Sequence, residues 1–260
     1  MRKFTTALAA SLLLAGTAHA EDQKLKMATI APSLGAAIAM STFANVVNNN
    51  AEGIEIEVSG GGAATVHMME VGRGNLDMSM TSPVVYNLMS AGKAMYAKQE
   101  EAPELAKNLS LVMWYPYGAY HFAVRADSNI EILDDIEGAS VFLGPQGGGA
   151  YNAARGWVQS TTGLVAGEDF DAIKANWQTG YQAFLDGKID VYVTGCLDPC
   201  GQFIQFTETE NVRFLAPESH EGEAVAKFLG KWRYKADIPA GAYSGQKNES
   251  AVTSFDTAVG

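Results

Sequence analysis

The chain has 260 residues, of which 47% are hydrophobic, and it carries a formal net charge of −11. This length and apolar content can bury a real core and predict one large domain or two modest ones. The acidic excess argues against nucleic-acid binding, because proteins of that class need a basic surface to neutralise phosphates. It does not exclude an anionic ligand, since helix termini and one or two basic groups set the potential inside a cleft.

The N-terminus predicts a Sec signal peptide over residues 1–20. Arg2 and Lys3 precede an apolar stretch over residues 7–15, and Ala18-His19-Ala20 stands before Glu21. Residue 21 is not a cysteine, so the cleavage site lacks the thiol needed for lipid attachment. The apolar stretch is too short to cross a bilayer, and no later run approaches the roughly 18 apolar residues that a membrane helix needs. We expect a protein exported to the periplasm.

Residues 25–62 contain the sequence signals of two successive βα units. A strand over 25–30 leads into the turn 31–35 and a helix, and an alternating strand over 54–58 leads into the glycine-rich turn 59–62 and a second helix. Such alternation is typical of an α/β protein with a parallel sheet. Ligands of open α/β sheets bind beyond the carboxyl ends of the strands, so these strand ends are expected to converge on one crevice.

A sequence pattern recurs in the two halves of the chain. Gly74–Thr81 and Gly187–Thr194 both read glycine, polar, aliphatic, aspartate, three strand-like residues and threonine, and each follows a helical segment. Chance could produce such a pattern, but two related lobes explain it better. We assign residues 21–123 and 216–260 to lobe I and residues 124–215 to lobe II. Strands within 109–125 and 212–215 are expected to cross between the lobes and to act as a hinge.

A glycine-rich turn is the most informative local feature. The strand Val141–Leu143 runs into the turn 144–149, and an amphipathic helix begins near Ala150 and ends before Gly163. Glycines let a ligand approach the backbone closely, and a helix N-terminus offers unpaired N–H groups and a positive dipole end. The turn therefore predicts a cradle for a small anion, although a tight turn can need glycine without any ligand.

The predicted ligand-binding residues lie at the strand ends and in the first turn of that helix. Hydroxyl groups there can donate to carboxylate oxygens without burying a charge, and capping of the following helix is the equal alternative. The candidate residues are Ser33, Gly35, Ser59, Gly61, Thr81, Ser82, Gly147, Gly148, Gly149, Tyr151, Thr194 and Gly195.

The sequence does not decide whether the basic and aromatic residues near the predicted strand ends contact the ligand. Arg73, Arg125 and Arg155 could each pair with a carboxylate or lie in solvent. Tyr117 and Trp177, like Trp114, could wall a ligand site, but aromatic residues at strand and helix positions are more often part of the core.

Cys196 and Cys200 predict a disulfide within one short loop. In an exported protein a pair of cysteines favours a disulfide over a redox motif or a zinc site, and two free thiols are the alternative. A metal site would need more ligands, and none of His67, His121 and His220 stands at metal-ligand spacing from the cysteines. We expect no metal.

The chain resembles the TAXI-type solute-binding proteins of tripartite ATP-independent periplasmic (TRAP) transporters. The resemblance rests on the leader and on Thr29–Gly35, Ser59–Gly62, 127–149, Gly187–Asp190 and Thr194-Gly195. It implies an α/β, type II periplasmic-binding-protein fold, in which two α/β lobes close on a ligand cleft. It also implies a carboxylate solute such as glutamate or 2-oxoglutarate, and delivery to the membrane-embedded subunits of a sodium-coupled TRAP permease. We expect a monomer without cofactors.

Three departures from the family pattern bear on these expectations. Members commonly have Gly-Ser-Gly where this chain has Gly147–Gly149, which removes a hydroxyl donor and could shift ligand chemistry. Members typically show only a glycine and a proline where this chain has the Cys196–Cys200 loop. They also continue through further helices beyond 241–243, so the chain ending at Gly260 is expected to be a fragment.

The sequence carries no recognised enzyme motif. It has no Gly-x-Ser-x-Gly elbow, no His-Glu-x-x-His, no phosphate-binding loop with Gly-Lys-Ser/Thr and no dinucleotide fingerprint after a strand. We therefore expect a binding protein without catalytic activity. A binding component of an ATP-driven importer and a secreted enzyme on the same fold are the alternatives, because fold alone does not fix function.

Overall fold

The computed structural model describes residues 23–32 and 34–260. The predicted signal peptide and Ser33 lie outside the described residues. The strands are β1 (Gln23–Thr29), β2 (Ile54–Gly60), β3 (Met78–Ser79), β4 (Tyr115–Pro116), β5 (Tyr120–Arg125), β6 (Ser140–Phe142), β7 (Asp171–Ala172), β8 (Val191–Gly195), β9 (Val212–Phe214), β10 (Arg233–Ile238) and β11 (Val252–Val259). The helices are α1 (Gly35–Asn50), α2 (Ala64–Arg73), α3 (Pro83–Ser90), α4 (Ala102–Ala106), α5 (Gly149–Thr162), α6 (Trp177–Leu185), α7 (Gly201–Thr207) and α8 (Glu223–Leu229).

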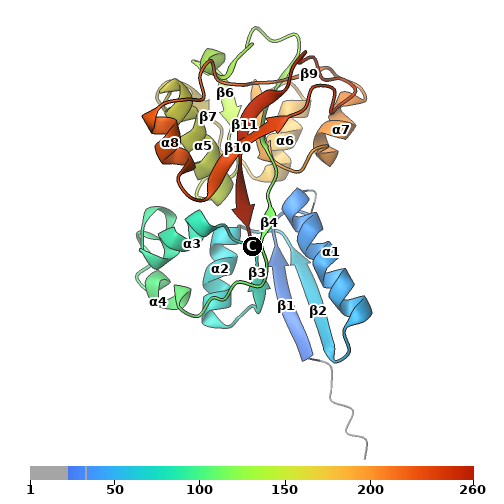
Figure 1. The fold of residues 1–260 in the computed structure, drawn as a ribbon, viewed down its shortest axis with the longest axis vertical. Coiled ribbons are helices and arrows are strands. Elements are labelled where there is room, and N and C mark those ends of the chain that lie inside the picture. The colour runs from blue at the N-terminus through green and yellow to red at the C-terminus, as the bar shows by residue number, and fades with distance from the viewer. Residues whose placement is uncertain (1–22, 33) are drawn as a thin grey trace, which may run out of the picture.

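Two α/β lobes lie one above the other, joined at β4 and at the end of β11 (Figure 1). In lobe I, β1 lies between β2 and β3 and is parallel to both, and α1 to α4 pack around this sheet. In lobe II the strand order is β7-β6-β8-β5-β9, where β6 is parallel to β7 and β8, and β5 is antiparallel to β8 and β9.

The repeated sequence pattern forms the same structure in each lobe. Gly74 and Gly187 follow helices α2 and α6 with φ of 79° and 68°, a conformation that glycine adopts without steric cost. The Asp77 carboxylate then accepts a hydrogen bond of 2.7 Å from the Lys26 N–H on β1, and Asp190 accepts one of 2.8 Å from the Ser140 N–H on β6. In both lobes this aspartate fixes the start of a strand beside its parallel neighbour.

The C-terminal segment, residues 216–260, packs on lobe II. The assignment predicted from the sequence was lobe I. Helix α8 lies against α5, and the antiparallel pair β10–β11 crosses the upper body in Figure 1. Phe255 is fully buried there, with ring centroids 4.2 Å from Tyr120 and 5.3 Å from Trp157. Burial of these large side chains holds the segment on lobe II. Only its end reaches lobe I, where Gly260 exchanges backbone hydrogen bonds with Thr81.

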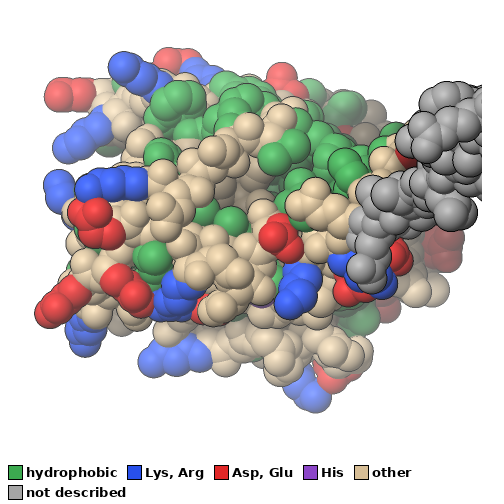
Figure 2. All heavy atoms as spheres, turned by 90° about the horizontal axis from the view of Figure 1, so that it is seen from below, with side chains coloured by type: hydrophobic (Ala, Val, Ile, Leu, Met, Phe, Trp, Pro, Cys, Tyr) green, Lys and Arg blue, Asp and Glu red, His purple; other side chains and the backbone are tan. Residues whose placement is uncertain are grey.

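An apolar groove on lobe I remains open to solvent. Figure 2 shows hydrophobic side chains gathered around a hollow on this lower face. The groove has a volume of about 420 Å³ and lies among α1, α2, α3, β3 and the segment 109–115. Val112, Leu111 and Trp114 at its rim are 66%, 51% and 48% exposed, and Trp232 beside them is 43% exposed. No helix in the described part of the chain is long and apolar enough to span a membrane.

Candidate ligand-binding cleft

A cavity of about 540 Å³ lies between the two lobes. Its walls come from the ends of β1 and β3, the turns before α2, α3 and α5, the start of α6, the crossing segment before β5, and the C-terminal strands β10 and β11. Both lobes and the segment that joins them therefore contribute to one site, as expected for a ligand that is enclosed when lobes close.

Four helices begin at this cavity. The N-terminal residues of α2, α3, α5 and α6 line it, and the last three belong to helices of 8, 14 and 9 residues. The first turn of each helix has backbone N–H groups without an intrahelical acceptor, and its dipole is positive at this end. Side chains cap two of the helices: Ser82 Oγ accepts from the Val85 N–H at 3.2 Å, and Asn176 Oδ1 accepts from the Thr179 N–H at 2.8 Å. The remaining N–H groups favour an anion in the cleft.

Arg233 is the only charged side chain among the described residues that line the cavity. Its Nη1 donates to the Phe228 carbonyl at 2.8 Å, and its guanidinium lies 4.3 Å from the centre of the Phe228 ring. The Nε atom is buried and has no hydrogen-bond partner in the described chain. Arg233 forms no ion pair with a described Asp or Glu. Burial lowers the pKa of this guanidinium, although arginine remains charged at neutral pH.

Tyr117 and Tyr120 bring two further polar groups to the same cavity from the crossing segment. Their side chains are 4% and 2% exposed. Neither hydroxyl makes a hydrogen bond within the described chain, and neither is among the fully enclosed polar atoms, so both face the cavity. Burial raises the pKa of both tyrosines, and the nearby Arg233 opposes this rise for Tyr120. Both hydroxyls are therefore neutral donors at physiological pH.

Five of the predicted ligand-binding residues line the cavity: Gly61, Thr81, Ser82, Gly148 and Gly149. Ser82 also caps α3, so the capping role considered for it is present in the structure. Thr81 Oγ1 donates to the Ser82 carbonyl at 3.3 Å.

The other described candidates lie behind the cavity wall. Ser59 Oγ donates to the Met27 carbonyl at 3.3 Å, and Thr194 is fully buried within lobe II. Gly35 faces Cys196, and Gly195 packs on the Tyr117 ring. Gly147 and Tyr151 also lie outside the cavity lining.

The three arginines that the sequence offered as partners for a carboxylate lie outside the cavity lining. Arg73 pairs with Glu70 and Glu101, Arg125 lies 3.2 Å from Glu210, and the Arg155 guanidinium lies 6.0 Å from the Tyr151 ring centre. Arg233 was missed because no local motif marks it. It reaches the cleft through the pairing of β10 with β11, in which Arg233 lies opposite Thr257, another residue that lines the cavity.

A disulfide joins Cys196 and Cys200 in the loop between β8 and α7. The bridge holds together a loop of lobe II that begins immediately after β8. Within the described residues no cluster of three or more His, Cys, Asp or Glu side chains is arranged to hold a metal ion.

The arrangement of two α/β lobes around an interlobe cavity defines the class of protein. The structure is similar to that of the periplasmic aliphatic sulphonate-binding protein SsuA from Escherichia coli, with a TM-score of 0.51 and 16% sequence identity over 90% of this chain and 61% of that one. It is also similar to the alkanesulfonate-binding protein SsuA from Xanthomonas axonopodis pv. citri bound to MOPS, with a TM-score of 0.52 and 13% identity over 92% and 66% of the two chains. The chain thus has a periplasmic-binding-protein-like α/β fold, which confirms the predicted fold class, and spans less than two thirds of either relative.

The chain belongs to the NMT1-like family, whose model matches residues 33–257. No curated protein sequence matches the chain. The match covers both lobes and the cleft between them, so the family assignment applies to the site described above.

Proposed function

We propose that this protein is a periplasmic solute-binding protein that captures a small organic anion without chemical turnover and presents it to a membrane transporter. One observation carries the proposal: Arg233, the Tyr117 and Tyr120 hydroxyls and four helix N-termini face one cavity that no described carboxylate lines. An anion supplies the missing acceptors and the missing negative charge. An uncharged solute would leave the buried guanidinium without a counterion, which is costly.

The solute head group is expected to lie against Arg233 and the two tyrosines. The planar guanidinium offers several N–H groups that match the oxygens of a carboxylate or sulfonate. The rest of the cavity is walled mainly by apolar side chains, including Val84, Leu88 and Met95. The body of the solute therefore contacts a largely apolar surface.

The solute class is a carboxylate in this proposal, of the kind represented by glutamate or 2-oxoglutarate, and the transporter is a sodium-coupled TRAP permease. Resemblance to TAXI-type proteins supports this choice. The second candidate is the binding component of an ATP-driven importer that takes a sulfonate. The structural similarity to two sulfonate-binding proteins favours that alternative.

A thermal-shift panel with the mature protein tests the proposal. Dicarboxylates, oxo acids, amino acids and alkanesulfonates form the test set, and neutral sugars and divalent metal ions are the controls. A ligand that binds only the folded state adds about 2.7 kcal/mol of stability at one hundred times Kd. At least one anion should raise the melting temperature and be recovered unchanged by mass spectrometry. A response confined to sugars or metal ions would contradict the anion assignment, and a changed product would contradict the absence of catalysis.

The same panel separates the two transporter assignments. A carboxylate that binds while alkanesulfonates fail supports the TRAP assignment, and the reverse supports the ATP-driven importer. Uptake of the bound solute by vesicles that contain the permease should then depend on a sodium gradient or on ATP.

A further inference from the structure

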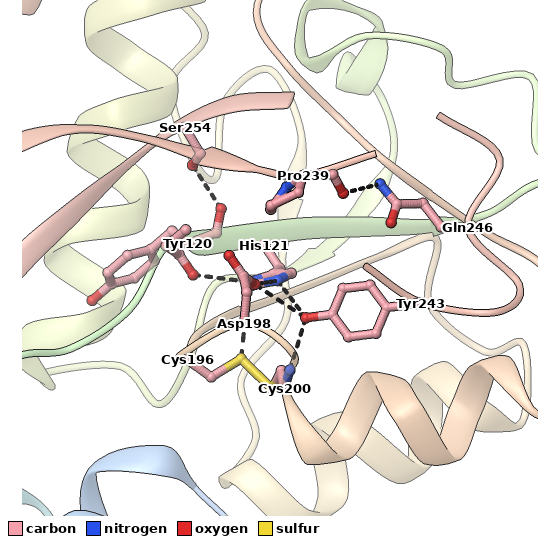
Figure 3. Close-up of polar contacts among 10 residues, drawn as sticks. Tyr120, His121, Cys196, Asp198, Cys200, Pro239, Tyr243, Gln246 and Ser254 are labelled. Carbon is pink, nitrogen blue, oxygen red and sulfur yellow. Dashed lines mark hydrogen bonds and ion pairs between the residues drawn. A yellow bond between two sulfur atoms is a disulfide. The ribbon is translucent and has the colours of Figure 1, made fainter. Parts of the chain in front are cut away.

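The strongest polar cluster outside the cleft surrounds the disulfide loop Cys196–Cys200, here called the Cys loop. Figure 3 shows His121 of β5 enclosed by Asp198 from this loop and by Tyr243 from the segment before β11. His121 is fully buried. Its Nε2 lies 2.7 Å from Asp198 Oδ1 and 2.8 Å from the Tyr243 hydroxyl, and its Nδ1 lies 2.8 Å from the Ala119 carbonyl.

Both ring nitrogens of His121 have polar partners. The Ala119 carbonyl can only accept, so Nδ1 must carry a proton. Nε2 lies within hydrogen-bond distance of two oxygens, one in the Asp198 carboxylate and the other in the Tyr243 hydroxyl. The Asp198 side chain, which meets Nε2 from the Cys loop, is 20% exposed.

Tyr243 completes the cluster. Its hydroxyl accepts from the Cys200 N–H at 2.9 Å and donates to Asp198 Oδ1 at 3.2 Å. The rings of Phe203 and Phe214 pack on the imidazole at centroid distances of 5.2 and 5.0 Å. The disulfide thus closes the base of the Cys loop, and the contacts of Asp198 and the Cys200 N–H with His121 and Tyr243 hold the loop to lobe II.

The fastened loop lies against the hinge and against lobe I. A Cβ atom added to Gly118 in the crossing segment would come within 2.0 Å of the Cys196 carbonyl carbon, so only glycine allows this approach. A Cβ atom on Gly35, the first residue of α1 in lobe I, would lie 3.7 Å from Cys196 Cβ and 3.8 Å from Leu197 N. The loop therefore lies close to the start of α1 in lobe I and directly against the segment that joins the lobes.

The loop also supports one wall of the cleft. Gly195 directly precedes Cys196, and a Cβ atom added to it would lie 2.3 Å from the Tyr117 ring. The Tyr117 hydroxyl faces the cavity. A shift of the Cys loop would consequently move both the start of α1 and a polar group of the cleft.

We propose that His121, Asp198 and Tyr243 are positioning residues that hold the Cys loop against the hinge, and that the loop thereby couples the placement of lobe I to that of the cleft residue Tyr117. The role in solute capture rests on the proposed function. The mechanical coupling from the Cys loop to α1 and Tyr117 does not.

Amide hydrogen exchange of the solute-free protein tests the coupling across the lobes. Asp198→Asn and Tyr243→Phe should each raise exchange at Ala37 and Ile38, the first amides that bond within α1, by about tenfold, as loss of one charge-assisted hydrogen bond predicts. Glu208→Gln, on the exposed end of α7, is the matched control and should leave these amides unchanged. Faster exchange confined to the Cys loop and α7 would show a local structural role and overturn the proposal.

A second readout follows Tyr117 directly. In protein labelled with 3-fluorotyrosine, the ¹⁹F signal that disappears in Tyr117→Phe should shift in Asp198→Asn and stay in place in Glu208→Gln. Should Asp198→Asn fail to fold, the double variant Cys196→Ser with Cys200→Ser releases the same loop and must produce the same two changes. An unmoved signal in a folded variant would contradict the coupling. Neither readout needs a solute, so a protein that shows both but binds no anion would retain the coupling and lose the proposed function.

Discussion

Two contacts with Phe228 position Arg233 in the cleft, and they leave the Nε–H of its guanidinium without a hydrogen-bond partner in the described chain. The Phe228 carbonyl accepts a hydrogen bond from the guanidinium and the Phe228 ring packs on it, while no described carboxylate forms an ion pair with Arg233. Replacement by glutamine keeps a polar side chain and removes the charge. Since a hydrogen bond to a charged group contributes about 1.5–3 kcal/mol, Arg233→Gln should weaken binding of the preferred anion about 10- to 100-fold in isothermal titration calorimetry.

Arg155→Gln is the matched control for this substitution. Arg155 lies on α5 outside the cavity lining, so its loss should leave affinity unchanged. Equal affinities for Arg233→Gln and the parent protein would remove the guanidinium from the proposed site.

Asp256 predicts a pH dependence of stability. Burial raises the pKa of this carboxyl above its usual value, even though the Tyr234 hydroxyl donates to it at 2.6 Å and the Gly118 N–H at 3.0 Å. The folded state therefore holds the Asp256 proton more tightly than the unfolded chain does. The contribution of Asp256 to the free energy of unfolding is favourable at low pH and is lost as pH rises through the folded pKa.

Urea unfolding of the parent protein and Asp256→Asn between about pH 3 and pH 8 measures this effect. The stability of the parent relative to the variant should fall with rising pH across the acidic range and then level off. A difference that does not change with pH would show that the carboxyl titrates alike in both states.

For single residues, the sequence indicates which side chains have polar groups but not where these groups point. Of the hydroxyls predicted at strand ends, those of Thr81 and Ser82 belong to residues that line the cavity, whereas Ser59 Oγ donates to the Met27 carbonyl inside the sheet. The sequence left Tyr117 open between a core residue and a wall of the ligand site; in the structure its side chain is buried and its hydroxyl faces the cleft. Sequence periodicity reports burial of a side chain, not the direction of its polar end.

At the scale of elements, two neighbouring glycines in the turn before α5 have different roles. Gly147 is needed for the conformation of the turn, and Gly148 is expected to contact the solute. Gly147 has φ of 81° and open space around it, whereas Gly148 has φ of −79° and lines the cavity. Gly147→Ala should cost about 1 kcal/mol of stability through left-handed strain and leave affinity intact. Gly148→Val adds atoms to the cavity wall, and its Cβ would lie 3.0 Å from the Pro145 carbonyl oxygen, so it should cost some stability but lower affinity by a larger factor.

Thermal melts and calorimetry on the two variants check this contrast. If both variants lose stability and affinity in equal proportion, the turn has only a structural role. Backbone strain does not account for an effect at Gly148, because its φ of −79° lies in the ordinary range for any residue.

The repeated pattern illustrates what sequence predicts well about elements. Glycine after a helix and aspartate before a strand are local signals, and both recur with the same hydrogen bonds in the two lobes. The path of the chain after β9 depends instead on the packing of Phe228 and Phe255 against Trp157. Such packing between distant segments leaves no periodic trace, and the assignment of 216–260 to lobe I differs from the structure for that reason.

At the scale of the whole molecule, the open apolar groove predicts that the protein binds hydrophobic dyes and self-associates. Contiguous apolar surface of this kind binds hydrophobic dyes and promotes association. Val112 is 66% exposed at its rim, so Val112→Glu should reduce fluorescence of 8-anilinonaphthalene-1-sulfonate and reduce concentration-dependent association in sedimentation velocity. Ile38→Glu, on an exposed face of α1 outside the groove, is the control and should change neither. Equal effects of the two substitutions would assign the dye signal to general surface hydrophobicity.

The composition of the cleft walls has a calorimetric consequence. When two lobes approach around a solute, partly exposed side chains such as Val84, Leu88, Met95 and Trp177 lose contact with water. Removal of apolar surface from water lowers heat capacity, so the binding enthalpy should become steadily more negative between about 10 and 35 °C. A temperature-independent enthalpy would mean that the solute is held by its polar contacts alone, with the two halves of the molecule remaining apart.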